Sequence, residues 1–344
     1  MGTKLKEIVI KKEIQIPELK DRVLVVDSYN TMYQFLTTIR MSDGSPLMDS
    51  KGNVTSHLNG IFNRTLNLMQ RGVKLAFVFD GKPPKLKTRE RERRAEAKEK
   101  ARKEYEIAKE RKDLDNMKKY AARTSRLTRD MVEEAKKLIS AMGLPVIQAP
   151  SEGEAQAAYI VNKGEAFAEV SQDFDCLMFS VPRMIRNLTI SGKRKLPGKL
   201  SFTTISPEII DLKENLNALG IDQDQLIALS MLVGTDFNPG GIKGIGPKNA
   251  LKLVRENKDD FDSMFSKAGW EDHFDFPWKE VYDVISNMPT TDDYELKWTT
   301  PDADKVKEIL VDEHDFSERR VNDVLEKLKS EKEKRSQTGL GDFV

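Results

Sequence analysis

The chain has 344 residues, of which 38% are hydrophobic and 33% charged, with a formal net charge of +1. It is long enough for two domains or one large α/β domain, and no apolar run approaches the roughly 18 residues of a membrane span. The N-terminal apolar stretch is too short for a signal peptide, and the single Cys176 cannot form an internal disulfide. These features predict a cytosolic or nuclear-type protein, and the net charge favours no class of partner.

Short apolar runs alternate with helical patterns in the first half. The runs at 22–30 and 74–84 read as buried strands that end in the acids Asp27 and Asp80. Residues 145–161 read as a strand, a turn and a helix. Strands that alternate with helices predict a sheet covered on both faces.

The segment 82–112 is rich in charge, basic in its first half and mixed later. Residues 85–124 have no large apolar face, so a helix there is normally solvated or mobile unless a partner covers it. The simpler alternative is a plain surface charge run.

A further strand is predicted at 169–180, EVSQDFDCLMFS, and another at 185–190. Asp173 and Asp175 lie two residues apart in the first of these. Side chains at i and i+2 of a strand point the same way, so the two carboxylates would crowd one position and repel each other.

The pattern changes at residue 223, where an apolar helix is stopped by Gly234 and followed by a glycine-rich turn, GIKGIG at 241–246. This turn resembles a helix-hairpin-helix, in which glycines let the backbone approach a phosphate and the next helix start points its N–H groups toward it. Such contacts ignore base sequence. The alternative is a plain connection between two helices. The residues predicted to contact DNA here are Gly241, Lys243, Gly244, Gly246, Lys248 and Lys252.

Seven acids lie at or just beyond the ends of buried elements or, for Asp173 and Asp175, on one side of a buried strand. They are Asp27, Asp80, Glu152, Glu154, Asp173, Asp175 and Asp236. The carboxyl ends of strands form the crevice where sites gather in open α/β sheets. Seven converging carboxylates could not all stay ionised without cations, and Mg²⁺ prefers such oxygen ligands. Two ions about 4 Å apart can activate water and stabilise the leaving oxygen of a phosphodiester. Taken singly, Asp27, Asp80 or Asp236 could be a turn or cap residue, and Ser151 with Glu154 fits a capping box. The pair Asp173 and Asp175 has no such simple alternative, because a buried strand offers acids no solvent.

On these residues the sequence resembles the flap endonuclease family of archaea and eukaryotes. The motifs that carry the resemblance are, in chain order, DSYNTMYQFL, TSHLNGIFNRT, FVFDGKPP, APSEGEAQAAY, SQDFDCLMF and GTDFNPGGIKGIGPKNAL. The resemblance implies a PIN-like or Rossmann-like α/β fold, with a mixed central sheet flanked by helices, a helical arch and a helix-hairpin-helix. It also implies a metal-dependent nuclease, with 5′–3′ exonuclease activity, that cuts 5′ flaps near single-strand/double-strand junctions in Okazaki fragment maturation and DNA repair.

The resemblance assigns roles to single residues. The seven acids match the ligands of two Mg²⁺ ions, for which Mn²⁺ can substitute, and a K⁺ ion is implied at the hairpin. Lys87 and Arg94 match the catalytic basic pair, and their spacing of seven places both on one helical face. Tyr33 matches the residue on which a base at the scissile nucleotide stacks, with a core aromatic as the alternative. Arg40 and Arg64 match phosphate-contacting positions near the flap pocket.

The resemblance also divides the chain. Residues 1–328 would form one nuclease body, with the arch and gateway at about 82–130 and the helix-hairpin-helix at about 223–257; residues 329–344 would be a flexible tail. The end of the tail resembles a sliding-clamp (PCNA) binding box anchored by Gln337, Leu340 and Phe343. The implied partners are branched DNA with 5′ flaps and the clamp, for a monomer in the cytoplasm of an archaeal-type cell with no membrane contact.

Two other readings of the sequence compete with this one. The first is a related 5′ exonuclease or bubble-cutting nuclease of the same superfamily, although the arch lacks the large insertion of the bubble-cutting branch. The second is a non-catalytic junction-binding protein tethered to the clamp, which would require that some of the acids be lost. All seven are present.

Overall fold

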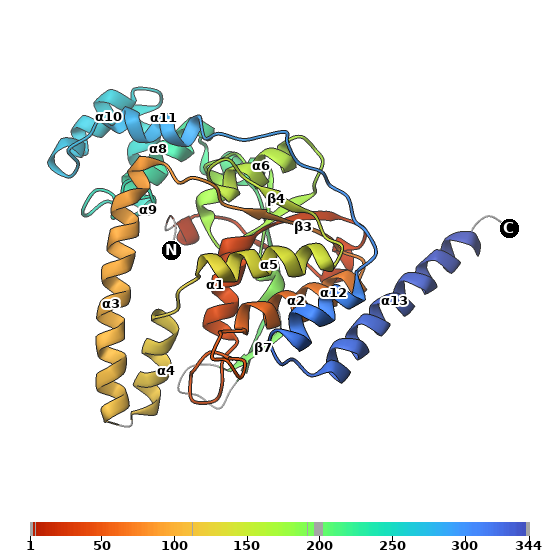
Figure 1. The fold of residues 1–344 in the computed structure, drawn as a ribbon. Helices are drawn as coiled ribbons and strands as arrows, with labels where there is room; N and C mark the ends of the chain where they lie inside the picture. Colours follow the sequence, from red (N-terminus) through yellow and green to blue (C-terminus); the bar gives the residue numbers. More distant parts are fainter. Residues whose placement is uncertain (1–2, 4, 112, 191, 196–201, 342–344) are drawn as a thin grey trace.

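The centre of the protein is a mixed seven-stranded sheet, as the sequence predicts. The computed structural model describes residues 3, 5–111, 113–190, 192–195 and 202–341 (Figure 1). The strand order is β1-β9-β6-β5-β2-β3-β4; neighbours from β6 to β4 are parallel, and β9 is antiparallel to both β6 and β1. A separate antiparallel pair joins β7 and β8. The strands are β1 (Lys12–Glu13), β2 (Val23–Asp27), β3 (Lys74–Phe79), β4 (Val146–Gln148), β5 (Ala168–Val170), β6 (Arg183–Arg186), β7 (Gly192–Lys195), β8 (Phe202–Ile205) and β9 (Glu208–Asp211).

Helices cover both faces of the sheet because its central strands are apolar on both sides. In β2, Leu24 and Val26 belong to one hydrophobic cluster and Val25 to the other, which is the alternation expected of a strand. The cluster around Leu24 is closed by α1 (Ser28–Thr38), α2 (Ser56–Gln70), α5 (Arg129–Ala141), α12 (Ala303–Lys307), a short π-helix (Glu308–Asp312) and α13 (Glu318–Gly341). The cluster around Val25 is closed by α6 (Gly153–Asn162), α7 (Leu212–Leu219), α8 (Gln223–Val233), α9 (Pro247–Asn257), α10 (Phe261–Lys267) and α11 (Trp278–Ser286).

Two helices stand out from the body over the segment predicted to form an arch. They are α3 (Thr88–Glu110), which follows a short 3₁₀ turn at Lys85–Lys87, and α4 (Leu114–Arg123); Figure 1 shows them side by side as a column. Only Glu90, Ala101 and Ala108 are buried in α3, so this helix buries little apolar surface. Its exposure follows from the missing apolar face.

The prediction of a strand over 169–180 is wrong beyond its first residues. β5 ends at Val170, and a 3₁₀ helix, η4 (Phe174–Leu177), begins after Asp173. Ser171 Oγ accepts a hydrogen bond from Asp173 N at 3.2 Å, and Asp173 Oδ1 accepts one from Asp175 N at 3.3 Å. Short polar side chains that bond to nearby backbone compete with the sheet ladder, so the chain turns here.

The strand predicted at 185–190 is also shorter than expected. β6 ends at Arg186, and residues Leu188–Ile190 form a 3₁₀ turn. Asn187 between them has φ of 61°, in the left-handed region, which interrupts an extended strand.

The segment predicted as a flexible tail, 329–344, has a helical backbone in its described part. α13 continues to Gly341, and its buried residues Val321 and Leu328 pack in the cluster around Leu24. The Lys, Glu and Arg residues after 328 are strong helix formers, which accounts for the extension. Of the predicted clamp-binding residues, Gln337 and Leu340 fall within α13, and Phe343 lies outside the described part of the chain. No helix in that part is long and apolar enough to cross a membrane.

Candidate active site

The ends of the parallel strands bring the first acids together. Asp27 is the last residue of β2 and caps α1, where its Oδ1 accepts a hydrogen bond from Asn30 N at 3.1 Å. Its Oδ2 accepts one from Ser171 Oγ at 3.2 Å, directly after β5. Asp80 follows β3, the neighbour of β2 on its other side. We call the seven predicted acids, Asp27, Asp80, Glu152, Glu154, Asp173, Asp175 and Asp236, the acid centre.

The start of α6 places the next acids beside Asp80. Gly153 N donates a hydrogen bond to Asp80 Oδ1 at 2.7 Å, and a Cβ on Gly153 would lie 2.7 Å from that oxygen. Glycine therefore lets the carboxylate reach the helix N-terminus, where the backbone favours negative charge. Glu152 and Glu154 flank Gly153. Ser151 does not cap the helix with Glu154, since Ser151 Oγ donates to Lys82 O at 3.0 Å.

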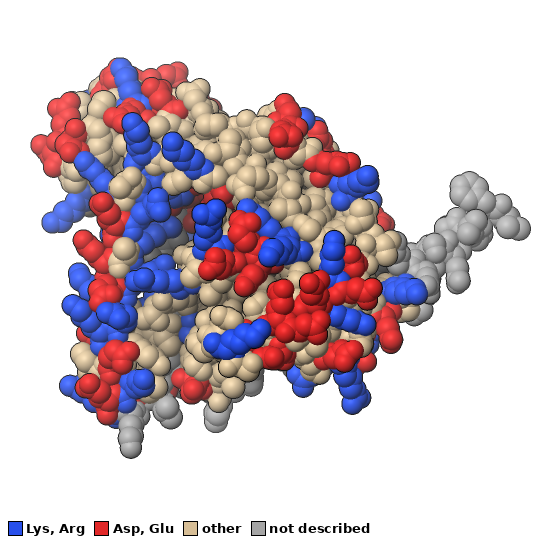
Figure 2. Space-filling model, in the orientation of Figure 1, with Lys and Arg blue, Asp and Glu red and all other residues tan. Residues whose placement is uncertain are grey.

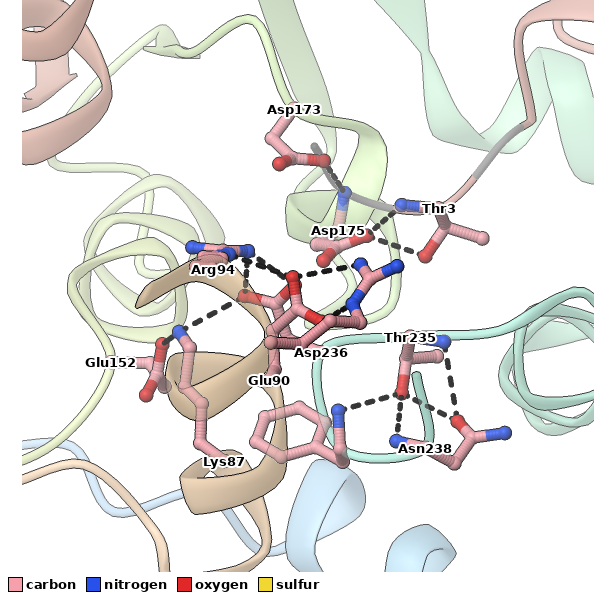
Figure 3. A network of polar contacts seen from close by, with 12 residues as sticks. Thr3, Lys87, Glu90, Arg94, Glu152, Asp173, Asp175, Thr235, Asp236 and Asn238 are labelled. Atoms are coloured by element: carbon pink, nitrogen blue, oxygen red, sulfur yellow. Dashed lines mark hydrogen bonds and ion pairs between the residues drawn. The ribbon is translucent and has the colours of Figure 1, made fainter. Parts of the chain in front are cut away.

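Asp173 and Asp175 enter the centre from η4 rather than from a strand (Figure 3). Asp175 Oδ1 accepts hydrogen bonds from both the backbone N of Thr3, at 2.6 Å, and its hydroxyl. Thr3 was missed by sequence reasoning because it lies 172 residues from its partner and in no motif.

The acid centre is short of positive charge. Burial, followed by the charge of a neighbouring acid, raises the pKa of Asp27 to about 7, of Asp80 to about 6 and of Asp175 to about 8, and that of Glu154 well above its usual value. The neighbouring acid is Asp80 for Asp27, and Asp173 for both Glu154 and Asp175. Each acid thus opposes the ionisation of another.

Two basic side chains from the foot of the arch reach into the same centre (Figure 3). Arg94 Nη2 donates to both oxygens of Asp236, at 2.6 and 2.8 Å. Lys87 forms an ion pair with Glu152, and its Nζ lies 3.4 Å from Asp236 Oδ2. Burial opposes protonation of Lys87, but the charges of Glu152 and Asp236 outweigh it and raise the pKa of its ammonium group. The structure therefore brings the predicted basic pair onto the predicted acids.

Glu90 supports this arrangement and was also missed by sequence reasoning. It is 1% exposed, and its Oε1 accepts from Arg94 Nε at 2.7 Å. Arg93 bonds to both of its oxygens, at 2.7 and 3.0 Å. The sequence did contain a signal for this contact. Glu90 precedes Arg93 by three residues and Arg94 by four, and side chains at these spacings are neighbours on a helix.

The donor set fits a divalent cation by its chemistry. Within the described residues, no group of three or more His, Cys, Asp or Glu side chains is arranged so that it could hold a metal ion as it stands. The carboxylate oxygens instead make the hydrogen bonds and ion pairs given above. Buried carboxylates with raised pKa values nevertheless form an oxygen-rich, cation-deficient site, which suits a hard ion such as Mg²⁺.

Two of the residues predicted to contact single-stranded DNA, Tyr33 and Arg40, lie beside α3 or the segment that follows α4. Lys98 Nζ, on α3, lies 3.2 Å from Tyr33 Oη and 5.0 Å from the centre of its ring. Tyr33 is half-buried whereas Phe35 is 1% exposed, so Phe35 is the core aromatic of α1. Arg40 donates to Gly44 O at 2.7 Å and to Ser125 Oγ, and Arg64 is exposed.

The predicted hairpin is a tight turn between α8 and α9. A Cβ on Gly241 would lie 2.3 Å from the carbonyl carbon of Val233, and the φ of Gly241 is 59°, so only glycine fits. The turn before it is held by Asn238 Oδ1, which accepts from Thr235 Oγ1 at 2.7 Å (Figure 3). The predicted DNA-binding lysines of the hairpin are exposed: Lys243, Lys248 and Lys252. Figure 2 shows Lys and Arg side chains gathered over the α3 column and the recess beside it.

Comparisons with known proteins agree with this geometry. Residues 2–101 match the XPG N-terminal domain and residues 143–236 the XPG I-region. The Flap endonuclease 1 of Thermococcus onnurineus is 50% identical over 329 residues, which cover 96% of this chain and 95% of that protein. The solved flap endonuclease-1 from Methanococcus jannaschii is 40% identical with a TM-score of 0.76, over 96% of this chain and 98% of that one. The catalytic core of Rad2 in complex with DNA substrate shares the fold at 24% identity and a TM-score of 0.65, over 92% and 96% of the two chains. The chain therefore belongs to the flap endonuclease family of XPG-type nucleases.

Proposed function

We propose that this flap endonuclease cuts branched DNA beside the junction of a 5′ flap with duplex, with two Mg²⁺ ions held by the acid centre. The observation that carries the proposal is the meeting of the acids with Lys87 and Arg94 at the foot of the arch. Mn²⁺ can take the place of Mg²⁺, since both prefer carboxylate oxygen. When bound, the ions supply an activated water and neutralise charge on the leaving oxygen.

The chain's own residues do the positioning. Lys87 and Arg94 carry their charge on the arch, so an entering phosphate can exchange for the carboxylates that these two cations now contact. Fixed cations aimed at developing charge contribute several kcal/mol to a rate. Glu90 holds Arg94 at its Nε, which leaves the other end of the guanidinium to face the site.

The remaining predicted contacts hold the substrate on either side of the cut. Tyr33 faces the arch and offers a ring on which an unpaired base can stack, and Arg40 and Arg64 supply charge for phosphates. The glycine turn between α8 and α9 offers backbone to a phosphate of the duplex, with the hairpin lysines at its side. A K⁺ ion would be held by backbone carbonyl oxygens of the glycine turn, residues 241–246, and would supply positive charge toward the phosphate.

The proposal extends to the partners. The protein acts as a monomer on branched DNA and is brought to it by a sliding clamp that binds Gln337, Leu340 and Phe343. Removing the residues after Arg335 should leave cutting of an isolated flap unchanged and abolish its stimulation by the clamp. Equal clamp binding by the truncated chain, measured by gel filtration, would rule out this segment as the docking site.

A cleavage map tests the proposed function. Purified protein with Mg²⁺ should cut a labelled double-flap DNA at the flap base, cut a bubble or a blunt duplex far less, and do neither in EDTA. Preferential cutting of the blunt duplex end would favour a 5′ exonuclease, and preferential cutting of the bubble a bubble nuclease. Metal-dependent binding without any cutting would favour a non-catalytic junction-binding protein.

A further inference from the structure

One buried carboxylate of the central sheet has no assigned role. Glu169 is the middle residue of β5, the fourth strand of seven, and its side chain is 0% exposed. Neither of its carboxylate oxygens has a hydrogen-bond partner among the described residues. A buried, ionised carboxylate without a partner is strongly destabilising, so its presence calls for a compensating cation or a proton.

The strand register places Glu169 on the face that leads to the acid centre. Glu169 pairs with Val25 in β2, and Val25 points into the cluster covered by α6. Asp27 lies two residues further along β2 than Val25 and hence on the same face, and Ser171 follows directly after the end of β5. Those two are joined by the 3.2 Å hydrogen bond, so Glu169 lies one pleat below the point where the strand ends meet.

The electrostatics agree with this direction. The charge of Glu169 adds to burial in raising the pKa of Cys176, on η4, and it also raises the pKa of Glu154. The main charged neighbours of Glu169 itself are Asp27 and Asp173. Its carboxylate therefore lies near acids from β2, η4 and α6, and such a group of acids suits a cation.

We propose that Glu169 is an eighth carboxylate of the acid centre, which strengthens the binding of a divalent cation from the floor of the site. This inference rests on the proposed metal-dependent function. The competing role is a neutral, protonated side chain that merely fills space beneath α6. A neutral side chain would leave metal affinity unchanged when replaced by its amide.

Metal binding separates the two roles without using activity. Mn²⁺ is titrated calorimetrically into metal-free full-length protein, and the rise in melting temperature at saturating Mn²⁺ is recorded for each variant. Glu169→Gln should weaken Mn²⁺ binding about tenfold, as expected for groups that support metal ligands, and reduce the metal-induced rise. The matched control is Glu326→Gln, which removes an exposed acid from α13 and should change neither quantity.

An affinity of Glu169→Gln within twofold of the unmodified protein would overturn the inference. Circular dichroism shows whether each variant is folded. If Glu169→Gln is unfolded, Glu169→Asp is tested instead, because the shorter side chain keeps the carboxylate but moves it away from the site by the length of one methylene group. Weaker Mn²⁺ binding by Glu169→Asp supports the inference, and unchanged binding overturns it. An unmodified protein that neither binds Mn²⁺ nor cuts flaps would instead overturn the proposed function itself.

Discussion

The acid centre and a second buried polar cluster differ in charge balance. The second, which we call the histidine cluster, contains His57, His314, Asp49 and Glu134. Asp49 Oδ2 lies 2.9 Å from His314 Nδ1, which must donate because the carboxylate only accepts. Glu134 lies between the two rings, 3.6 Å from His57 Nε2 and 3.7 Å from His314 Nε2, which are ion-pair rather than hydrogen-bond distances.

The pKa values of the acids move in opposite directions in the two clusters. Burial opposes ionisation of Asp49, but hydrogen bonds from Asn53 and His314 outweigh it and lower its pKa. Contact with His57 lowers the pKa of Glu134 against the effect of burial. In the acid centre, Asp27, Asp80, Glu154 and Asp175 lie near other acids, and burial together with those charges raises their pKa values. Complementary charges stabilise a fold, whereas like charges are retained where a function needs them.

Replacing Lys87 tests the functional side of this contrast and should have the largest effect. Lys87→Ala should slow single-turnover flap cutting about 10²–10³-fold, the range for loss of one preorganised charge-stabilising group, with flap affinity changed little. Rapid-quench kinetics and fluorescence anisotropy measure the two quantities. The control is Lys85→Ala, an exposed lysine on the same turn. A loss confined to affinity would show that Lys87 only attracts DNA.

Replacing Asp49 tests the structural side. Asp49→Asn removes the charge that faces His314, so it should lower the melting temperature by a few degrees while the cutting rate of the folded enzyme stays within about twofold. The control is Asp312→Asn, an exposed acid close to His314 in sequence. An unchanged melting temperature would mean that the histidine cluster contributes nothing to stability.

Acidification should give a smaller, graded effect in the same cluster. The pKa values of Asp49 and Glu134 are lowered from ordinary values of 3.8 and 4.5, so folding gains from their ionisation above pH 5. That gain disappears as the pH falls through the lowered pKa values, because both carboxylates must then be protonated. Urea unfolding between pH 6 and pH 3 should show a steeper loss of stability for the unmodified protein than for Asp49→Asn. If the stability of the two proteins fell equally with pH, ionised Asp49 would not stabilise the fold.

The acid centre was predictable where a local pattern marked it. Asp27 and Asp80 stand at the ends of apolar runs, and this placement alone locates them at the carboxyl edge of the sheet. The strand assigned to Asp173 and Asp175 was wrong, because apolar content concealed the local side-chain bonds that turn the chain after Val170. The argument that the i, i+2 spacing aims both carboxylates at one position depended on that strand, whereas the resemblance to the family did not.

Other residues carried no local signal. Thr3 meets Asp175, and His314 meets Asp49, across 172 and 265 positions of sequence. Only the folded chain brings them together, and neither pair follows a spacing rule. Glu169 could have been noticed as a charged residue within a segment predicted to be a buried strand. The face to which it points, however, depends on the register of β5 with β2.

The central claim is that the acids at the carboxyl edge perform the cleavage rather than support the fold. Asp173→Ala on a double-flap substrate tests it most directly, with Gln172→Ala as the neighbouring control. Flap affinity, measured by anisotropy in Ca²⁺, should stay within about threefold, and the Mg²⁺-dependent single-turnover rate should fall at least about 100-fold, since even outer-shell partners of metal ligands contribute 10–100-fold. Equal losses of binding and cutting, together with a lowered melting temperature, would contradict the claim.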